Sequence, residues 1–102
     1  MNKLSQQLTD LANELNTLAA SYKDQDGKRL LDLQDQLIDF ANAASLKQLQ
    51  ESDQNYKEAL AQIQKAMDII AKGSKKIDTI TKVIGIVGKI LESTAKAVAA
   101  VL

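Results

Sequence analysis

The chain has 102 residues, of which 45% are apolar and 25% are charged, and this length suits one globular domain rather than two. It contains no cysteine and no histidine, which excludes disulfides, thiolate metal sites and histidine-based catalysis. The formal net charge is zero, but residues 1–71 carry seven Lys/Arg against eleven Asp/Glu, whereas residues 72–102 carry six lysines against two acids. This uneven distribution of charge is the most informative feature of the composition.

Two helices are predicted in the first half of the chain from the spacing of apolar residues in steps of three and four. The first covers residues 3–22, with a stripe made of Leu4, Leu8, Leu11, Leu15, Leu18 and Tyr22. The sequence KDQDGK follows, and we expect a turn there because Gly27 can adopt a positive φ. The second helix covers residues 28–44, and Asp32, Asp35 and Asp39 lie away from its apolar stripe.

A third helix is predicted over residues 46–72, with Ser45 as a capping residue in the sequence SLKQ. The apolar stripe changes phase between Ala44 and Leu46, which indicates a kink or a tight corner, although one long helix through this point is an alternative. Asp53 interrupts the stripe, so a break within ESDQN is a further alternative. The sequence KGSKK ends this helix, because Gly73 suits the position after a helix C-terminus.

The fourth predicted helix, residues 75–101, is the most apolar part of the chain. At 100° per residue, one arc holds Ile77, Ile80, Val83, Ile84, Val87, Leu91, Val98 and Leu102, with Ile90 and Val101 at its edge. Lys75, Lys82, Lys89 and Lys96 repeat every seven residues on the opposite side. A flank of small residues, which includes Gly85 and Gly88, is expected to let another helix approach closely.

These four segments predict an all-α fold that forms a single domain over residues 1–102. Short connections favour an antiparallel helical bundle of about four helices with up-down topology, in which the first two helices are shorter and the last two longer. At 1.5 Å per residue the two pairs would measure roughly 25–30 Å and roughly 40 Å. The last hairpin could therefore project beyond the first and leave apolar surface for a partner.

No constellation of residues predicts an enzyme, a metal site or a cofactor site. The clustered carboxylates fall on polar helix faces, where a solvated surface is expected. The sequence DQDGKRLLDLQD does not match a calcium-binding loop, since Arg29 stands where glycine is required, and KGSKK lacks the spacing of a phosphate-binding loop. The neutral net charge and the single arginine argue against nucleic-acid binding.

The sequence therefore predicts a small non-enzymatic, cytoplasmic interaction module that acts by protein–protein contact, either with an unknown protein or by self-association. The opening residues form no continuous apolar core of a signal peptide, which is the basis for the predicted compartment. The residues expected to dock a partner are Lys75, Lys82, Lys89 and Lys96 by charge and Ile84, Val87 and Leu91 by apolar contact.

The alternative prediction is a membrane-active or membrane-surface-binding protein of a toxin or toxin-accessory type. In that case the cationic amphipathic helix at the C-terminus would bind an anionic membrane surface. Burial of the apolar arc discriminates between the two predictions, because a buried arc reaches lipid only when the bundle opens.

Overall fold

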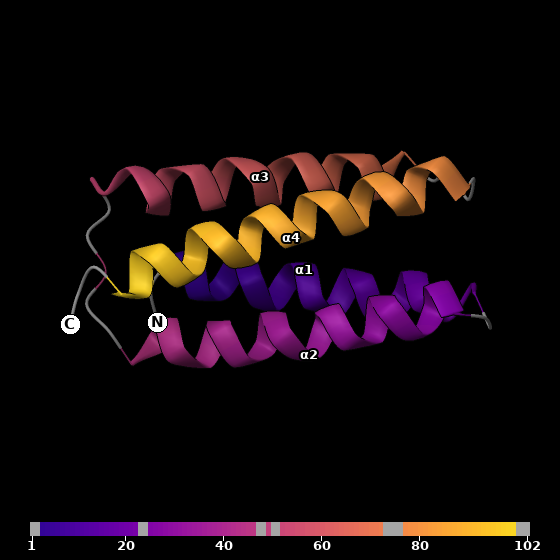
Figure 1. Ribbon diagram of the computed structural model, residues 1–102, viewed down its shortest axis with the longest axis horizontal. Coiled ribbons are helices and arrows are strands. Elements are labelled where there is room, and N and C mark those ends of the chain that lie inside the picture. Colours follow the sequence, from indigo (N-terminus) through magenta and orange to yellow (C-terminus); the bar gives the residue numbers. More distant parts are fainter. Residues whose placement is uncertain (1–2, 23–24, 47–48, 50–51, 73–76, 100–102) are drawn as a thin grey trace.

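The computed structural model describes residues 3–22, 25–46, 49, 52–72 and 77–99, although the side chains of residues 77 and 78 are not described. They form four α-helices, α1 (Lys3–Ala19), α2 (Gln25–Ser45), α3 (Gln54–Ala71) and α4 (Ile77–Ala99), and the described residues contain no strand. Successive helices run in opposite directions along a body that measures 39 × 19 × 18 Å (Figure 1). The predicted all-α, up-down bundle is thereby confirmed.

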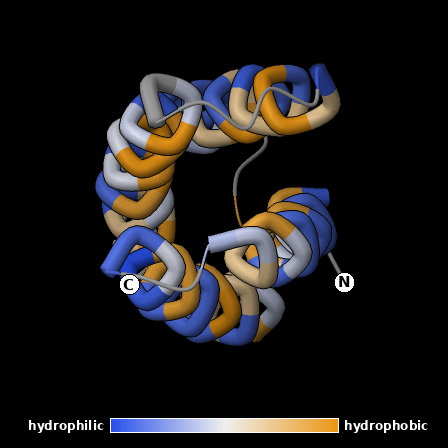
Figure 2. Tube along the Cα trace, turned by 90° about the vertical axis from the view of Figure 1, so that its right-hand side faces the viewer, coloured by the Kyte–Doolittle hydropathy of each residue, from blue (hydrophilic) through white to orange (hydrophobic). Residues whose placement is uncertain are grey.

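The helices pack as two antiparallel hairpins, α1 with α2 and α3 with α4. Additional contacts join α1 to α3 and α2 to α4, whereas the described parts of α2 and α3, although consecutive in the chain, do not touch. The helices surround a common axis when viewed end-on (Figure 2), and their contacts give the order α1, α2, α4, α3 around it. Since every helix has two neighbours, each must bury two adjoining sides and not one narrow stripe.

The core is aliphatic, and the leucine stripe of α1 lies at its centre. Leu4, Leu8, Leu11 and Leu15 are all fully buried, as the spacing predicts. They pack in one cluster with buried residues of the other helices, including Leu30, Leu37, Ala59, Ile63, Val83, Val87 and Ile90. A cluster that draws on all four helices explains why the described residues fold as one unit.

Two buried hydrogen bonds join α1 to its neighbours. The Ser5 hydroxyl donates to the carbonyl oxygen of Ala41 on α2 at 2.8 Å. The backbone amide of Leu4 donates to the hydroxyl of the buried Tyr56 on α3 at 3.3 Å. The second bond gives a partner to an amide in the first turn of a helix, where no intrahelical acceptor exists.

The third helix begins at Gln54, so the predicted start at residue 46 is wrong. Asp53 is its N-cap, because the Asp53 carboxylate accepts from the backbone amides of Asn55 (2.8 Å) and Tyr56 (3.1 Å). Two amide partners make this a stronger start than the predicted Ser45 cap. Ser45 instead ends α2, and Leu46, which the prediction placed in the stripe of the third helix, is 85% exposed.

The helix lengths also differ from those predicted. α1 and α3 have 17 and 18 residues, whereas α2 and α4 have 21 and 23. The longer helices are therefore one in each hairpin, and the expected overhang of the last hairpin does not occur among the described residues.

Gly27 has a different role from the predicted turn. It lies within the first turn of α2, which begins at Gln25, and it is buried. A Cβ atom at this position would collide with the carbonyl oxygen of Tyr22. The absence of a side chain therefore permits the close approach of the chain leaving α1, and no positive φ is involved.

The buried side of α4 is rotated from the predicted arc by roughly 70° at 100° per residue. Ile86 and Ile90 are buried, whereas Ile84, Leu91 and Val98 are only half-buried. Because α4 packs against both α2 and α3, its buried sector widens toward the lysine side. The lysines consequently border the buried sector instead of lying opposite it.

Substitutions at three glycines should separate the effect of close packing from that of helix propensity. Gly85→Ala and Gly88→Ala should each raise the free energy of unfolding by about 1 kcal/mol, because a Cβ at either position meets open space and alanine favours the helix. Gly27→Ala should lower it, because the Cβ would collide with backbone. Urea denaturation measures all three, and stabilisation by Gly27→Ala would contradict the packing assigned to α2.

Thr94 presents a second test of the core. Its side chain is fully buried on α4, and its Oγ1 has no hydrogen-bond partner. Thr94→Val keeps the shape and removes the unsatisfied hydroxyl, so we expect a gain of about 1 kcal/mol in unfolding free energy. Thermal denaturation should show a rise in Tm of about 4–8 °C. A fall in Tm would mean that a buried water satisfies the hydroxyl.

Candidate functional site

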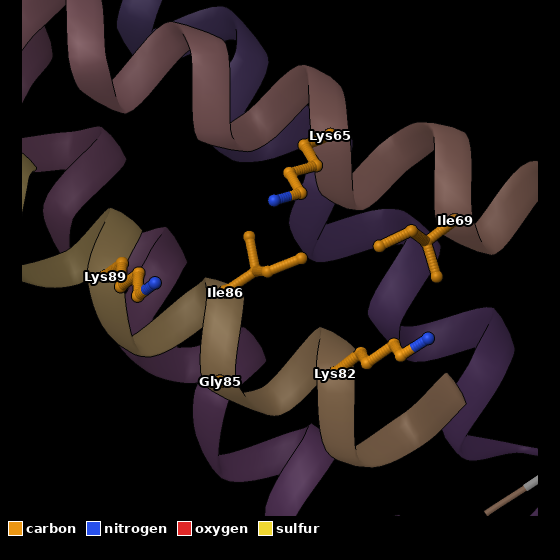
Figure 3. A pocket seen from close by; sticks show the side chains of 6 residues that line it. All are labelled: Lys65, Ile69, Lys82, Gly85, Ile86 and Lys89. Atoms are coloured by element: carbon orange, nitrogen blue, oxygen red, sulfur yellow. The ribbon is translucent and has the colours of Figure 1, made fainter. Parts of the chain in front are cut away.

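The groove between α3 and α4 contains a broad, open pocket. Its volume is about 470 Å³, and it opens to solvent. Two helices build it, with Lys65 and Ile69 from α3 and with Lys82, Gly85, Ile86 and Lys89 from α4 (Figure 3). We call these six residues the basic groove.

Apolar side chains form the floor of the basic groove and lysines form its rim. Ile86 is 9% exposed and Ile69 is half-buried, so both present part of an aliphatic side chain to the opening. Lys65, Lys82 and Lys89 are exposed, and their ammonium groups spread around the isoleucines instead of converging on one point (Figure 3). Gly85 has no side chain to close the opening, and the site is therefore shallow, broad and cationic.

The positive charge of the basic groove is not neutralised by the described part of the chain. None of its three lysines forms an ion pair with a described carboxylate. The ion pair that does occur on α4 joins Lys96 Nζ to Glu92 Oε1 at 3.3 Å, with side chains 60% and 68% exposed. Such an exposed pair contributes little to stability. The groove therefore offers three charges to an anionic partner.

The groove continues along α3 and α4 into a smaller pocket of mixed charge. This second pocket has a volume of about 160 Å³ and is lined by Asn55, Glu58, Gln62, Lys89, Glu92, Ser93 and Lys96. Lys89 belongs to both pockets. Glu58 and Glu92 thus lie beyond the basic groove, so the surface along α3 and α4 changes from positive charge to mixed charge.

The structure places the predicted docking residues in two different environments. Lys82 and Lys89 line the basic groove and Lys96 lines the second pocket, whereas Lys75 lies outside the described residues.

The predicted aliphatic contacts lie elsewhere. Val87 is fully buried, so its contacts are with this chain's own helices. Ile84 and Leu91 are half-buried and pack against the core, and Ile84 also borders a pocket between α2 and α4. Lys82, Lys89 and Lys96 therefore lie along one surface, and the predicted aliphatic residues do not join them.

Sequence reasoning missed Lys65, Ile69 and Ile86. Ile86 lies only about 40° from Lys82 around the helix, and an isoleucine beside a lysine ridge was the available sign that the buried sector extended there. Nothing in the sequence indicated which helix would face the ridge. Lys65 and Ile69 could therefore be assigned to the site only once α3 was seen beside α4.

Neutralising the rim should leave the fold intact, because the three lysines are exposed and unpaired. We expect Lys65→Gln, Lys82→Gln and Lys89→Gln each to change the free energy of unfolding by less than about 0.5 kcal/mol. Combining the three should preserve the helical circular dichroism spectrum. Cooperative unfolding at a much lower urea concentration would show instead that the lysine stems support the bundle.

Within the described ranges, no cluster of His, Cys, Asp or Glu side chains is arranged to hold a metal ion. None of the described helical segments combines the length and the hydrophobicity required to span a membrane. Comparison with protein-family models, curated proteins and solved structures finds no match to this chain.

Proposed function

We propose that this protein is a non-enzymatic interaction module that binds an acidic, partly apolar segment of a protein partner in the basic groove. The observation that carries the proposal is the combination of Lys65, Lys82 and Lys89, all unpaired, with an aliphatic floor. Carboxylates of a partner would meet the lysines, and an aliphatic side chain would cover Ile69 and Ile86. Charge would guide the encounter, and apolar contact would retain the partner.

The shape of the groove favours a helix as the partner. Lys82 and Lys89 are two helical turns apart on α4, which is about 10 Å along the axis. Their ammonium groups point in different directions (Figure 3), so the three charges are spread over the groove and not gathered around one compact anion. Carboxylates distributed over two turns of an amphipathic helix match this separation.

Burial of the apolar side of α4 supports a protein partner over a membrane. Val83, Val87 and Ile90 are fully buried, so a lipid surface could reach them only after the bundle opens. Opening a domain costs on the order of 5–15 kcal/mol. Without apolar insertion, lysines near an anionic membrane contribute only about 1 kcal/mol each.

A synthetic peptide tests the proposal directly. The probe is a fluorescently labelled helical peptide with one leucine between three aspartates spaced over two turns, and its match carries asparagine at those positions. Fluorescence anisotropy should show salt-sensitive binding of the acidic peptide to the protein. Binding should weaken at least about fivefold for the triple variant K65Q/K82Q/K89Q, since each exposed charge pair contributes up to about 1 kcal/mol.

Two controls decide between the candidate functions. Lys57→Gln removes an exposed lysine of α3 that does not line the basic groove, and it should leave peptide binding unchanged. Co-sedimentation with anionic and neutral vesicles at low and high salt tests the membrane alternative. Equal peptide binding by the triple variant would refute the docking role, and strong binding to anionic vesicles alone would favour the membrane function.

A further inference from the structure

The outer side of α2 carries a ridge of charge opposite to that of the basic groove. Asp32, Asp35 and Asp39 are exposed, and none forms an ion pair with a described residue. Leu31, which is 44% exposed, lies on the same side of the helix. We call these four residues the acidic ridge. It presents three free carboxylates and one large aliphatic side chain to solvent.

The acidic ridge matches the basic groove in charge, apolar content and spacing. Three aspartates are available to three lysines, and Leu31 adds an exposed aliphatic side chain beside the aspartates. Asp32 and Asp39 are seven residues apart, as are Lys82 and Lys89, and both pairs span about 10 Å along a helix. A helix with the features of α2 is therefore a partner of the kind that the groove requires.

We infer that the basic groove of one molecule binds the acidic ridge on α2 of a second copy of this chain. The inference rests on the proposed function, for which it names the partner. An antiparallel alignment of α2 against α4 brings Asp32 to Lys89 and Asp39 to Lys82. The same alignment carries Arg29, which lies one turn before Asp32 on α2, toward Glu92 in the pocket of mixed charge. The charge pattern along the groove thus sets the direction of the incoming helix.

The ridge and the groove are separate surfaces of one molecule. The groove lies between α3 and α4, whereas the ridge lies on α2, which does not contact α3. A contact that joins two different surfaces is heterologous, so each added molecule offers a new free groove or ridge. Self-association should therefore continue past the dimer. Exposed ion pairs are weak, so we expect a dissociation constant on the order of 0.1–1 mM at low salt.

Sedimentation velocity of the whole protein tests the inference with two complementary variants. The ridge variant D32N/D35N/D39N keeps an intact groove, and the groove variant K65Q/K82Q/K89Q keeps an intact ridge. At low salt the wild type should form species that grow with concentration, and each variant alone should remain monomeric. An equimolar mixture of the two variants should form a 1:1 complex and nothing larger, because each partner supplies one working surface.

A matched control removes carboxylates from α1, the helix that pairs with α2. D10N/E14Q neutralises two exposed side chains of α1 that lie outside the ridge, and it should associate as the wild type does. Association of the ridge variant at the wild-type level, or a wild type that stays monomeric up to about 1 mM, would overturn the inference. If the wild type stays monomeric but the acidic peptide binds, the inference fails and the proposed function stands. If the peptide also fails to bind, both fail.

Discussion

The position of α4 between two neighbours determines the character of the molecular surface. α4 packs against α3 on one side and α2 on another, and it must therefore bury a broad sector that runs from Ile86 to Ile80. The exposed residues of α4, which include Gly85 and Gly88, take up the opposite side of the helix. The seven-residue lysine repeat thus lies at the edge of the buried sector, where Lys82 and Lys89 meet Lys65 of α3 across a partly apolar groove. The packing of α4 against α2 and α3 therefore determines both which of its residues are buried and where its lysines lie.

The sequence predicted the helices well and their boundaries less well. The leucine stripe of α1 is regular, and all four of its central leucines are fully buried as expected. The start of α3 was misjudged because apolar periodicity gave weight to Leu46, whereas Asp53 starts the helix by accepting from two backbone amides. Leu46 is 85% exposed. The spacing of apolar residues along a sequence does not show whether a given leucine is buried or exposed. Capping chemistry was the better guide at this boundary.

The candidate site was only half predictable for a related reason. Lysines at a spacing of seven identify a ridge on one helix, so Lys82 and Lys89 could be named from the sequence. A groove, however, needs a second wall, and the second wall depends on which helices become neighbours. In a bundle where α2 and α3 are diagonal, chain order does not reveal that Lys65 and Lys89 line the same groove. Val87 was predicted to contact a partner because it lies in the apolar arc, and in the structure it is fully buried among this chain's own helices.

Gly85 shows how the demands of folding and of binding diverge within this helix. A glycine inside a helix costs about 1 kcal/mol relative to alanine, and no atom of the bundle uses the space that Gly85 leaves open. The fold alone would therefore favour a larger residue. Gly85 lines the basic groove, where a side chain would occupy part of the space open to a partner. The loss of helix stability at Gly85 is explained if it keeps the apolar surface of the groove accessible to a partner. A contact made only of exposed charge pairs would be too weak to hold that partner.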